Sequence, residues 1–303
     1  MKIVEYKAGH EDRLAKLDVS LSNPLSLCWQ ITKRCNYKCP FCLCGANESD
    51  ELSFNAMQKI INILNDANLV RIDFTGGEPL LRADFCEILT YASDKGIETL
   101  VTSNGSIWDR KIAQTLVETN TLLLVSIDGD EKTHDRFRGR GAYKKAVTNV
   151  MKYHSFGVPI RINCLIHKEN TDQINYVYEL VKSLGVDRLF YILIAPQGRA
   201  YGETDLLLTD EERSDLLAKL KIMKHESGDS PFITIQDYST LGNYHSCFLI
   251  DSKGDVISQG YTQDECIRVG NILTDGLSKC WNNPAVNQKG HFLQYSYMFN
   301  YYM

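Results

Sequence analysis

The sequence predicts an α/β fold built on a parallel sheet, and two features of its apolar pattern support this prediction. Between about residues 25 and 195, short apolar runs rich in β-branched and aromatic residues alternate with stretches of helical spacing. Each run is apolar on both faces, as expected for strands covered on both sides by helices. Six such units in a row fit either a partial barrel or an open doubly wound sheet, and the pattern alone does not separate these two.

The six apolar runs are the predicted strands. They are LSLCWQI (25–31), VRIDFT (70–75), TLVTS (99–103), LLLVSIDG (122–129), IRINCLI (160–166) and RLFYILI (188–194). Between the first two, apolar residues recur at i, i+3, i+4 and i+7, which predicts a helix that buries Met57, Ile60, Ile61 and Leu64. Residues 174–184 repeat this spacing before Gly185, which suits a helix end. Thr209 and Glu212 form a capping-box pattern that predicts a further helix after a loop at 196–208.

From residue 229 onward the sequence changes in character. FITIQ (232–236), CFLI (247–250) and VIS (256–258) are short and strand-like, DSKGD (251–255) suits a hairpin turn, and a last helix is expected at about 275–282. We therefore divide the chain into an N-terminal segment (1–23), an α/β domain with its following helix (24–228), and a small α+β unit (229–303).

The composition limits the class of protein. A chain of 303 residues with 44% hydrophobic and 23% charged residues suits one large soluble domain with a small appendage. A net charge of -5 weighs against a nucleic-acid partner, because phosphate binding usually comes with a basic surplus. No apolar run approaches the ~20 residues that cross a bilayer, and the start lacks the apolar core of a signal peptide. We therefore expect a cytoplasmic protein without a membrane partner.

The ten cysteines indicate metal or catalytic use, because disulfides are rare in a reducing compartment. Cys35-x3-Cys39-x2-Cys42 directly follows the first predicted strand. Thiolates on such a loop can hold an iron–sulfur cluster, and three ligands leave one iron of a four-iron cluster open. The alternative is a structural zinc site that recruits Cys44 as a fourth ligand.

These three cysteines, with Phe41 before the last, resemble the motif of radical S-adenosylmethionine (SAM) enzymes. The resemblance covers about residues 24–195 and implies a partial (β/α)6 TIM-like barrel. It also implies that a 4Fe-4S cluster on these cysteines binds SAM at its open iron. An electron from the cluster then cleaves SAM to a 5′-deoxyadenosyl radical, which abstracts a hydrogen atom from the substrate.

Further motifs at the predicted strand ends suit the same cofactor. In Gly76-Gly77-Glu78-Pro79 the glycines allow a close backbone approach to a ligand, and Glu78 can accept hydrogen bonds from an ammonium group. The resemblance implies that this segment meets the methionyl amine of SAM.

Small polar residues end the third and fourth strands, at Ser103-Asn104 and Ser126-Ile127-Asp128. They suit ribose hydroxyls, although ordinary turns use the same residues. The resemblance implies that Ser126 contacts SAM and that Arg138 pairs with its carboxylate, for which a guanidinium has the right geometry. It also suggests an adenine contact at the backbone of residues 193–195, beginning with Leu193.

The C-terminal unit resembles the SPASM and twitch extensions of the same family, through Val269-Gly270-Asn271-Ile272 followed by Leu277 and Trp281. Such extensions hold auxiliary iron–sulfur clusters. This sequence departs from the pattern, since the second expected cysteine position falls near Gln259, and too few cysteines remain for a full SPASM domain. The remaining cysteines are Cys247, Cys266 and Cys280. In one interpretation they hold a single auxiliary cluster, with an open iron or with His245 as fourth ligand. In the other interpretation they are small buried residues.

We therefore predict a radical SAM enzyme that epimerises, dehydrogenates or cross-links a peptide or a small polar metabolite. A flavodoxin- or ferredoxin-type protein is the expected electron donor. Cys164 and Cys247 are candidate hydrogen-atom donors, because a thiol can quench a substrate radical. The alternatives are a radical SAM enzyme of cofactor biosynthesis and, from another class, a zinc-binding or redox-sensing module that does not cleave SAM.

Overall fold

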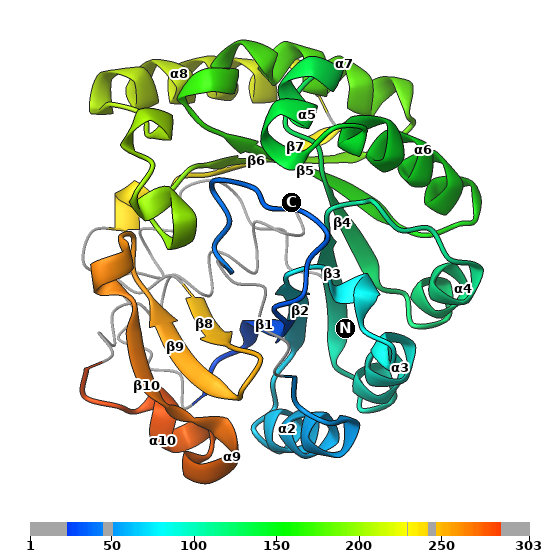
Figure 1. Ribbon diagram of the computed structural model, residues 1–303, viewed down its shortest axis with the longest axis vertical. Helices are drawn as coiled ribbons and strands as arrows, with labels where there is room; N and C mark the ends of the chain where they lie inside the picture. Colours follow the sequence, from blue (N-terminus) through cyan, green and yellow to red (C-terminus); the bar gives the residue numbers. More distant parts are fainter. Residues whose placement is uncertain (1–22, 45–50, 229, 242–246, 286–303) are drawn as a thin grey trace.

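A single ten-stranded sheet organises the protein, whose computed structural model describes residues 23–44, 51–228, 230–241 and 247–285. The strand order is β10-β9-β8-β1-β2-β3-β4-β5-β6-β7. Pairs from β8 through β1 to β7 are parallel, whereas β9 is antiparallel to both of its neighbours. The sheet curves into an open barrel with helices around its outside (Figure 1). The predicted α/β class and partial barrel are confirmed.

All six predicted strands are present in the predicted order. They are β1 (Ser26–Thr32), β2 (Arg71–Gly76), β3 (Glu98–Ser103), β4 (Leu122–Ser126), β5 (Ile160–Ile166) and β6 (Arg188–Leu193). Helices join them on the outside, namely α2 (Phe54–Asp66), α3 (Phe85–Asp94), α4 (Arg110–Glu118), α5 (Glu131–Arg138), α6 (Ala142–Ser155) and α7 (Ile174–Ser183). Short 3-10 turns occur at Pro79–Leu81, Lys168–Gln173, Gly198–Tyr201, Thr204–Leu206, Tyr238–Leu241 and Gln263–Glu265.

The helix signals of the sequence act as expected. The apolar stripe of α2 is fully buried, and the Ser53 side chain accepts a hydrogen bond from the first turn of this helix. Gly185 follows α7 with φ +68°, a conformation that glycine adopts without a steric cost. The capping box of Thr209 and Glu212 is formed at the start of α8 (Asp210–Glu226). In the described part of the chain, no helix is both long and apolar enough to span a membrane.

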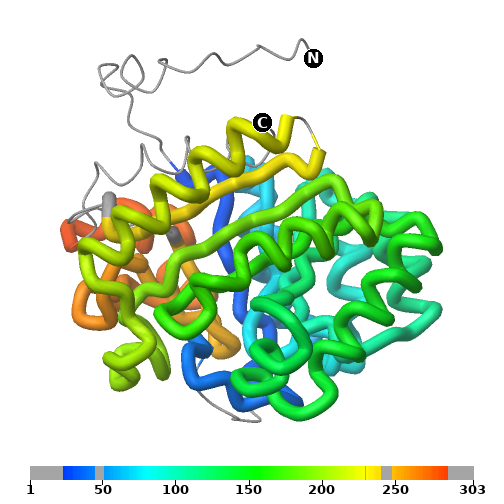
Figure 2. The backbone as a smooth tube through the Cα atoms, turned by 90° about the horizontal axis from the view of Figure 1, so that it is seen from above, coloured from blue at the N-terminus to red at the C-terminus, as the bar shows by residue number. Residues whose placement is uncertain are grey.

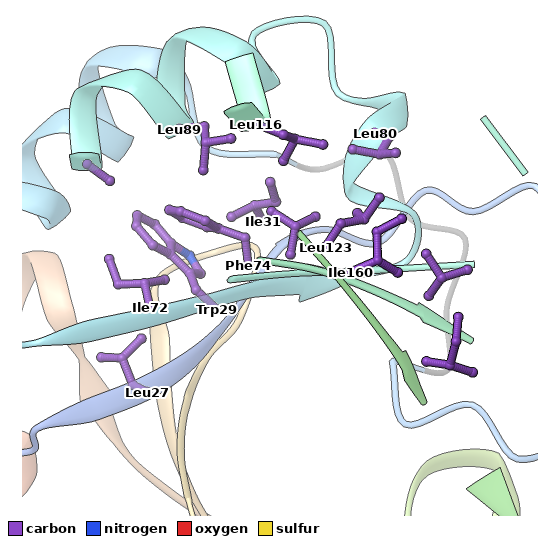
Figure 3. Packing of buried hydrophobic residues seen from close by; sticks show 14 of the residues in the cluster. Leu27, Trp29, Ile31, Ile72, Phe74, Leu80, Leu89, Leu116, Leu123 and Ile160 are labelled. Atoms are coloured by element: carbon purple, nitrogen blue, oxygen red, sulfur yellow. The ribbon is translucent and has the colours of Figure 1, made fainter. Parts of the chain in front are cut away.

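The main core lies between the sheet and the helices. Large side chains of neighbouring strands, such as Trp29 and Phe74, point from the sheet toward α2 and α3 and are fully buried (Figure 3). Because successive strand residues alternate faces, the residues between them point to the inside of the barrel. There Cys28, Asp73 and Thr75 remain partly exposed. Our expectation that both faces of these strands are apolar and covered was therefore wrong at these positions, where polar and partly exposed side chains face the inside of the barrel.

The C-terminal segments join the same sheet at both of its sides. The FITIQ strand is β7 (Phe232–Gln236), which pairs in parallel with β6 rather than with the C-terminal unit to which we assigned it. Strand β8 (Cys247–Ile250) pairs with β1, and the predicted turn leads into β9 (Asp255–Gln259). An unpredicted strand, β10 (Ile267–Asn271), follows, and then two short helices, α9 (Ile272–Asp275) and α10 (Leu277–Trp281).

Polar contacts connect the segment after β6 to the loop between β9 and β10. Gln197 is buried, and its Nε2 donates to the carbonyls of Gly260 at 2.6 Å and Tyr261 at 2.9 Å. Arg213 of α8 forms a buried ion pair with Asp237 at 2.6 Å and also donates to the Tyr261 hydroxyl at 2.7 Å. These two segments therefore lie side by side, although more than fifty residues of chain separate them (Figure 2).

The buried ion pair yields a prediction about stability. Arg213→Met should lower the free energy of unfolding by about 3–5 kcal/mol, because it removes the guanidinium from a buried ion pair with Asp237. The double variant with Asp237→Asn should recover part of this loss, because no unpaired charge remains. Denaturant unfolding measures both, with the exposed Lys221→Met on the same helix as control. Equal stability of Arg213→Met and the control would contradict the assignment.

Candidate active site

The three motif cysteines lie on the loop that follows β1, at the carboxyl ends of the parallel strands. Cys39 is buried, whereas Cys35 and Cys42 are partly exposed. The Cys35 sulfur accepts a hydrogen bond from the Tyr37 backbone N–H at 3.4 Å, and the Cys42 N–H donates to the Cys39 carbonyl at 3.3 Å. Burial raises the pKa of both Cys35 and Cys39, so these thiols are protonated in the metal-free protein at neutral pH.

The start of this cysteine loop rests directly on Gly76 and Gly77. The Gly77 N–H donates to the Thr32 carbonyl, and the Glu78 N–H donates to the Arg34 carbonyl, both at 2.8 Å. A Cβ on Gly77 would lie 2.0 Å from the Arg34 carbonyl oxygen, and one on Gly76 would lie 2.2 Å from that of Thr32. We expected the two glycines to allow the close approach of a ligand. In the structure they allow the close approach of the residues that begin the cysteine loop, and these contacts fix the position of the loop.

Glu78 joins the ends of two neighbouring strands. Its carboxylate is fully buried and accepts hydrogen bonds from the Leu80 N–H at 3.1 Å, the Ser103 hydroxyl at 2.9 Å and the Asn104 N–H at 2.7 Å. Burial raises the pKa of Glu78 to about 7 despite these three donors. A carboxylate offers about four acceptor positions, so capacity for one further donor remains. Pro79 follows at the start of a buried 3-10 turn.

The end of β3 contacts the cysteine loop through Asn104. Its amide nitrogen donates to the Asn36 side-chain oxygen at 2.8 Å and lies 3.9 Å from the Cys35 sulfur. Ser103 supports this turn, because its hydroxyl accepts a hydrogen bond from the Gly105 N–H at 3.0 Å. The predicted residues at the ends of β2 and β3 are therefore gathered around Cys35.

A buried ion pair occupies the end of β4. Arg138 donates from Nε to Asp128 at 2.5 Å and from Nη2 at 3.2 Å, and the Leu165 N–H donates to the same carboxylate at 3.1 Å. Burial alone would raise the pKa of Asp128, but the guanidinium holds it below its ordinary value. We predicted that Arg138 pairs with the cofactor carboxylate; in the structure it pairs with Asp128. Ser126, on the inner face of the same strand, is partly exposed.

Two buried histidines near this pair escaped the sequence prediction. His134 accepts a hydrogen bond from the Asp128 N–H at 3.2 Å, and burial lowers the pKa of His134 to about 4. His167 packs against Phe41 and Phe137, with ring centres 5.6 Å and 4.3 Å away, and burial also lowers its pKa. Neither belongs to a motif that singles it out in the sequence. Since His134 is neutral at pH 7, Arg138 is the cation that balances Asp128.

A small second hydrophobic cluster anchors the cysteine loop. It combines buried residues of the loop, of α5 and of the segment after β6, namely Cys39, Phe41, Phe137, Ile194, Ala200 and Leu206. The Arg138 guanidinium carbon lies 5.4 Å from the Phe41 ring centre, so the ion pair borders this cluster. The phenylalanine inside the cysteine motif therefore fixes the loop by packing.

Several predicted site residues lie elsewhere. Cys164 and Leu193 are both 1% exposed and belong to the helix-covered core, which argues against a hydrogen-donor role for Cys164 and a side-chain contact by Leu193. Cys280 is likewise in that core, next to Gly270. The Cys266 thiol donates to the Thr262 carbonyl at 3.4 Å. The side chain of Cys247 and all of His245 lie outside the described residues.

The donor set of the cysteine loop fits an iron–sulfur cluster. Across the described ranges, no three His, Cys, Asp or Glu side chains are arranged as the ligands of one metal ion. A four-iron cluster instead takes each thiolate on a separate iron, so its cysteines need not converge on one point. Cys35, Cys39 and Cys42 would be its ligands.

The fold and the site together define a partial barrel with a three-cysteine loop at the carboxyl ends of its strands. The model of the Radical SAM superfamily matches residues 29–181, and the chain belongs to this family. Enzymes of this family use a 4Fe-4S cluster and SAM as cofactors.

Relatives in the family differ in what they act on. The chain is 30% identical over 208 residues to the Fe-coproporphyrin III synthase of Methanosarcina barkeri, which covers 66% of this chain and 52% of that protein. It is 27% identical over 283 residues to the mycofactocin maturase MftC of Mycolicibacterium smegmatis, covering 88% and 72%. The chain thus spans about half the length of the synthase.

The fold resembles that of Streptococcus suis SuiB, solved with its precursor peptide SuiA. The TM-score is 0.74 at 17% identity, over 90% of this chain and 68% of SuiB. At this identity the likeness shows the fold alone.

The glycine contact yields a test of how the loop is placed. Gly77→Ala should lower the free energy of unfolding by about 1–3 kcal/mol and reduce iron binding, because its Cβ would collide with the Arg34 carbonyl. Gly202→Ala is the matched control, since its Cβ would lie 4.0 Å from its nearest neighbour, the Arg199 carbonyl oxygen. Thermal unfolding and iron content after anaerobic reconstitution measure both effects. Wild-type iron content in Gly77→Ala would refute the proposed support.

The cysteine assignment yields a second test. Wild type should bind about four irons per chain at this loop, and Cys35→Ala, Cys39→Ala or Cys42→Ala should each abolish that cluster. Cys44→Ala should retain it, because a three-cysteine cluster does not use that thiol. Zinc in place of iron, lost in Cys44→Ala, would instead establish the structural zinc site.

Proposed function

We propose that this radical SAM enzyme abstracts a hydrogen atom from a carbon of a peptide or small polar metabolite bound on the inner face of the barrel. The observation that carries this proposal is the convergence of the strand ends. The cysteine loop, the Glu78 carboxylate and the Asp128–Arg138 pair lie at the same edge of the sheet, above its polar interior.

The residues of this edge have distinct roles in the proposed reaction. When bound, the cluster and SAM together supply a 5′-deoxyadenosyl radical that takes a hydrogen atom from the substrate. Cys35, Cys39 and Cys42 hold the cluster. Glu78 would accept a hydrogen bond from the SAM ammonium group, whose positive charge would favour the ionised form of this buried carboxylate.

The remaining cofactor contacts that we propose come from the carboxyl ends of β2, β3, β4 and β6. Ser103 and Asn104 at β3 and Ser126 at β4 supply polar groups for the ribose, and Gly76, Gly77 and Pro79 shape the turn beside it. Asp128 acts through Arg138, because the ion pair fixes the guanidinium at the cysteine loop. The backbone at Leu193 remains the proposed adenine contact, since its side chain lies in the core.

The interior of the barrel favours a polar substrate. Arg161 of β5 donates to the Asn163 side chain at 2.9 Å and lies over the Phe190 ring at 4.5 Å. Asp73 of β2 accepts from the Thr102 hydroxyl at 3.0 Å, and burial raises the pKa of this carboxyl to about 6, against the influence of Arg161. A cation, Arg161, and a carboxyl group, Asp73, thus face the inside of the barrel. Such groups could bind the carboxylate and amide groups of a peptide.

The relatives support two substrate classes. The fold neighbour SuiB, which is bound to a precursor peptide, is consistent with a peptide as the first candidate. The 30% identity to Fe-coproporphyrin III synthase favours the second candidate, a tetrapyrrole in cofactor biosynthesis, whose propionates would also suit Arg161.

We also propose that the C-terminal unit could hold an auxiliary iron–sulfur cluster. Cys247 pairs in register with Gln259 of β9, and the pairing of Ile267 with Ser258 brings Cys266 to the other side of Gln259. Two cysteines thus flank the position that the SPASM pattern fills with a third. The burial of Cys280 in the core argues against its being a ligand. A flavodoxin- or ferredoxin-type donor would supply the electrons.

Product analysis tests the proposed function. Reconstituted wild type reduced with dithionite in the presence of SAM should release 5′-deoxyadenosine, and the Cys35/Cys39/Cys42→Ala variant should release none. Short peptides and coproporphyrin-type tetrapyrroles are then compared as additives by mass spectrometry. A peptide that loses two hydrogens or exchanges one with solvent supports the first class, and a modified tetrapyrrole supports the second. Absence of 5′-deoxyadenosine from iron-loaded wild type would overturn the proposal.

A further inference from the structure

The segment after β6 contacts the cysteine loop from the side opposite to Gly76 and Gly77. The Arg199 backbone N–H donates to the Cys42 carbonyl at 3.1 Å, and its side-chain Nη1 donates to the Cys39 carbonyl at 2.9 Å. One residue thus holds the carbonyls of two of the three predicted cluster ligands. Neither bond uses a thiol, so metal binding by the thiols does not compete for either acceptor.

The neighbouring glycine brings Arg199 this close. Gly198 has φ +57°, and a Cβ there would lie 2.4 Å from the Cys42 carbonyl oxygen and 2.7 Å from the Leu43 Cα. Ala200, on the other side of Arg199, is buried in the hydrophobic cluster that contains Cys39 and Phe41. The backbone of Arg199 is therefore placed by packing on both sides, and its guanidinium is placed by the hydrogen bond to the Cys39 carbonyl.

The same segment is fixed to the C-terminal unit. The Gly198 N–H donates to the Gln263 side chain at 2.9 Å, and the Gln263 N–H donates to the Pro196 carbonyl at 3.0 Å. Gln197 holds the carbonyls of Gly260 and Tyr261. The C-terminal unit thereby supports the cysteine loop through residues 196–201, without touching it in any of these contacts.

A fixed guanidinium at this place has an electrostatic consequence. Arginine keeps its charge at any pH at which proteins are folded. A cluster bound by three thiolates is anionic, and reduction by a low-potential one-electron donor adds one more negative charge without forming or breaking a bond. Because a nearby cation stabilises the more negative state more strongly, it raises the reduction potential.

We propose that Arg199 is a positioning residue that holds the cysteine loop by its carbonyls and raises the reduction potential of the cluster bound there. This inference rests on the assignment of Cys35, Cys39 and Cys42 as cluster ligands. It adds a residue outside the cysteine, glycine and strand-end motifs of the cofactor site.

The first test measures the midpoint potential of the reconstituted protein by electron paramagnetic resonance. Arg199→Gln should lower the midpoint potential by about 59 mV, a tenfold change in the oxidised-to-reduced ratio at fixed potential. Arg199→Lys should restore at least half of this shift, because it keeps the charge. Arg188→Gln is the matched control, since Arg188 is also partly exposed but lies at the opposite end of β6, and it should leave the potential unchanged.

The second test uses the iron-free protein and hydrogen exchange of the peptide that covers residues 38–44. Arg199→Gln should speed the exchange of this peptide about tenfold, which corresponds to 1.4 kcal/mol, and Arg188→Gln should leave it unchanged. A variant that no longer loads iron but shows this faster exchange supports the positioning role. If Arg199→Gln shows both unchanged hydrogen exchange of residues 38–44 and the wild-type midpoint potential, the inference about Arg199 is overturned, whereas the cysteine assignment is not affected. A wild type without an iron–sulfur cluster would overturn the cysteine assignment and the inference with it.

Discussion

The active-site edge depends on the close approach of two backbone segments, residues 32–34 and Gly76-Gly77. Parallel strands bring β1 and β2 side by side, but side chains would normally separate the chain beyond their ends. Here the absence of two Cβ atoms lets the carbonyls of Thr32 and Arg34 accept backbone hydrogen bonds from the next strand. Because the cysteines follow directly, their starting position and direction are set by the backbone, which holds its geometry more rigidly than side chains do.

Three further elements complete the support of the cysteine loop. Asn104 meets it from β3, Phe41 inserts into a cluster with Phe137 of α5, and Arg199 holds it from beyond β6. The loop itself is neither helix nor strand, so it has no regular hydrogen bonds of its own to define its shape. Contacts from β2, β3, α5 and the segment after β6 replace them. A cluster-binding loop of this kind therefore needs most of the barrel to be folded around it.

The sequence was sufficient for the six strands β1 to β6 in chain order, the helices α2, α7 and α8 and the cysteine motif, because each has a local signal. Apolar runs of strand length, the stripe of α2 and the capping box at Thr209 act through neighbours in the chain. What it did not reveal depends on contacts distant in sequence. The pairing of β7 with β6, the inward direction of Asp73 and the outward direction of Cys164 follow from sheet curvature and register. Arg199 lies in the segment PQGRA (196–200). The glycine of this segment predicts a turn, but nothing in the sequence indicates that the arginine after it contacts the cysteine loop.

The Asp128–Arg138 pair shows why such distant contacts serve the site rather than the fold. A buried ion pair adds little net stability, because the loss of hydration of both charges offsets most of their attraction. Asp128 is nevertheless surrounded by donors from the Leu165 N–H and the Arg138 guanidinium, so its position is fixed within the barrel edge. That carboxylate in turn fixes Arg138 against Phe41 at the cysteine loop. Because Asp128 balances the charge of Arg138, this pair orders the edge of the cysteine loop without adding net charge to it, and the electrostatic effect that we propose for Arg199 is separate from it.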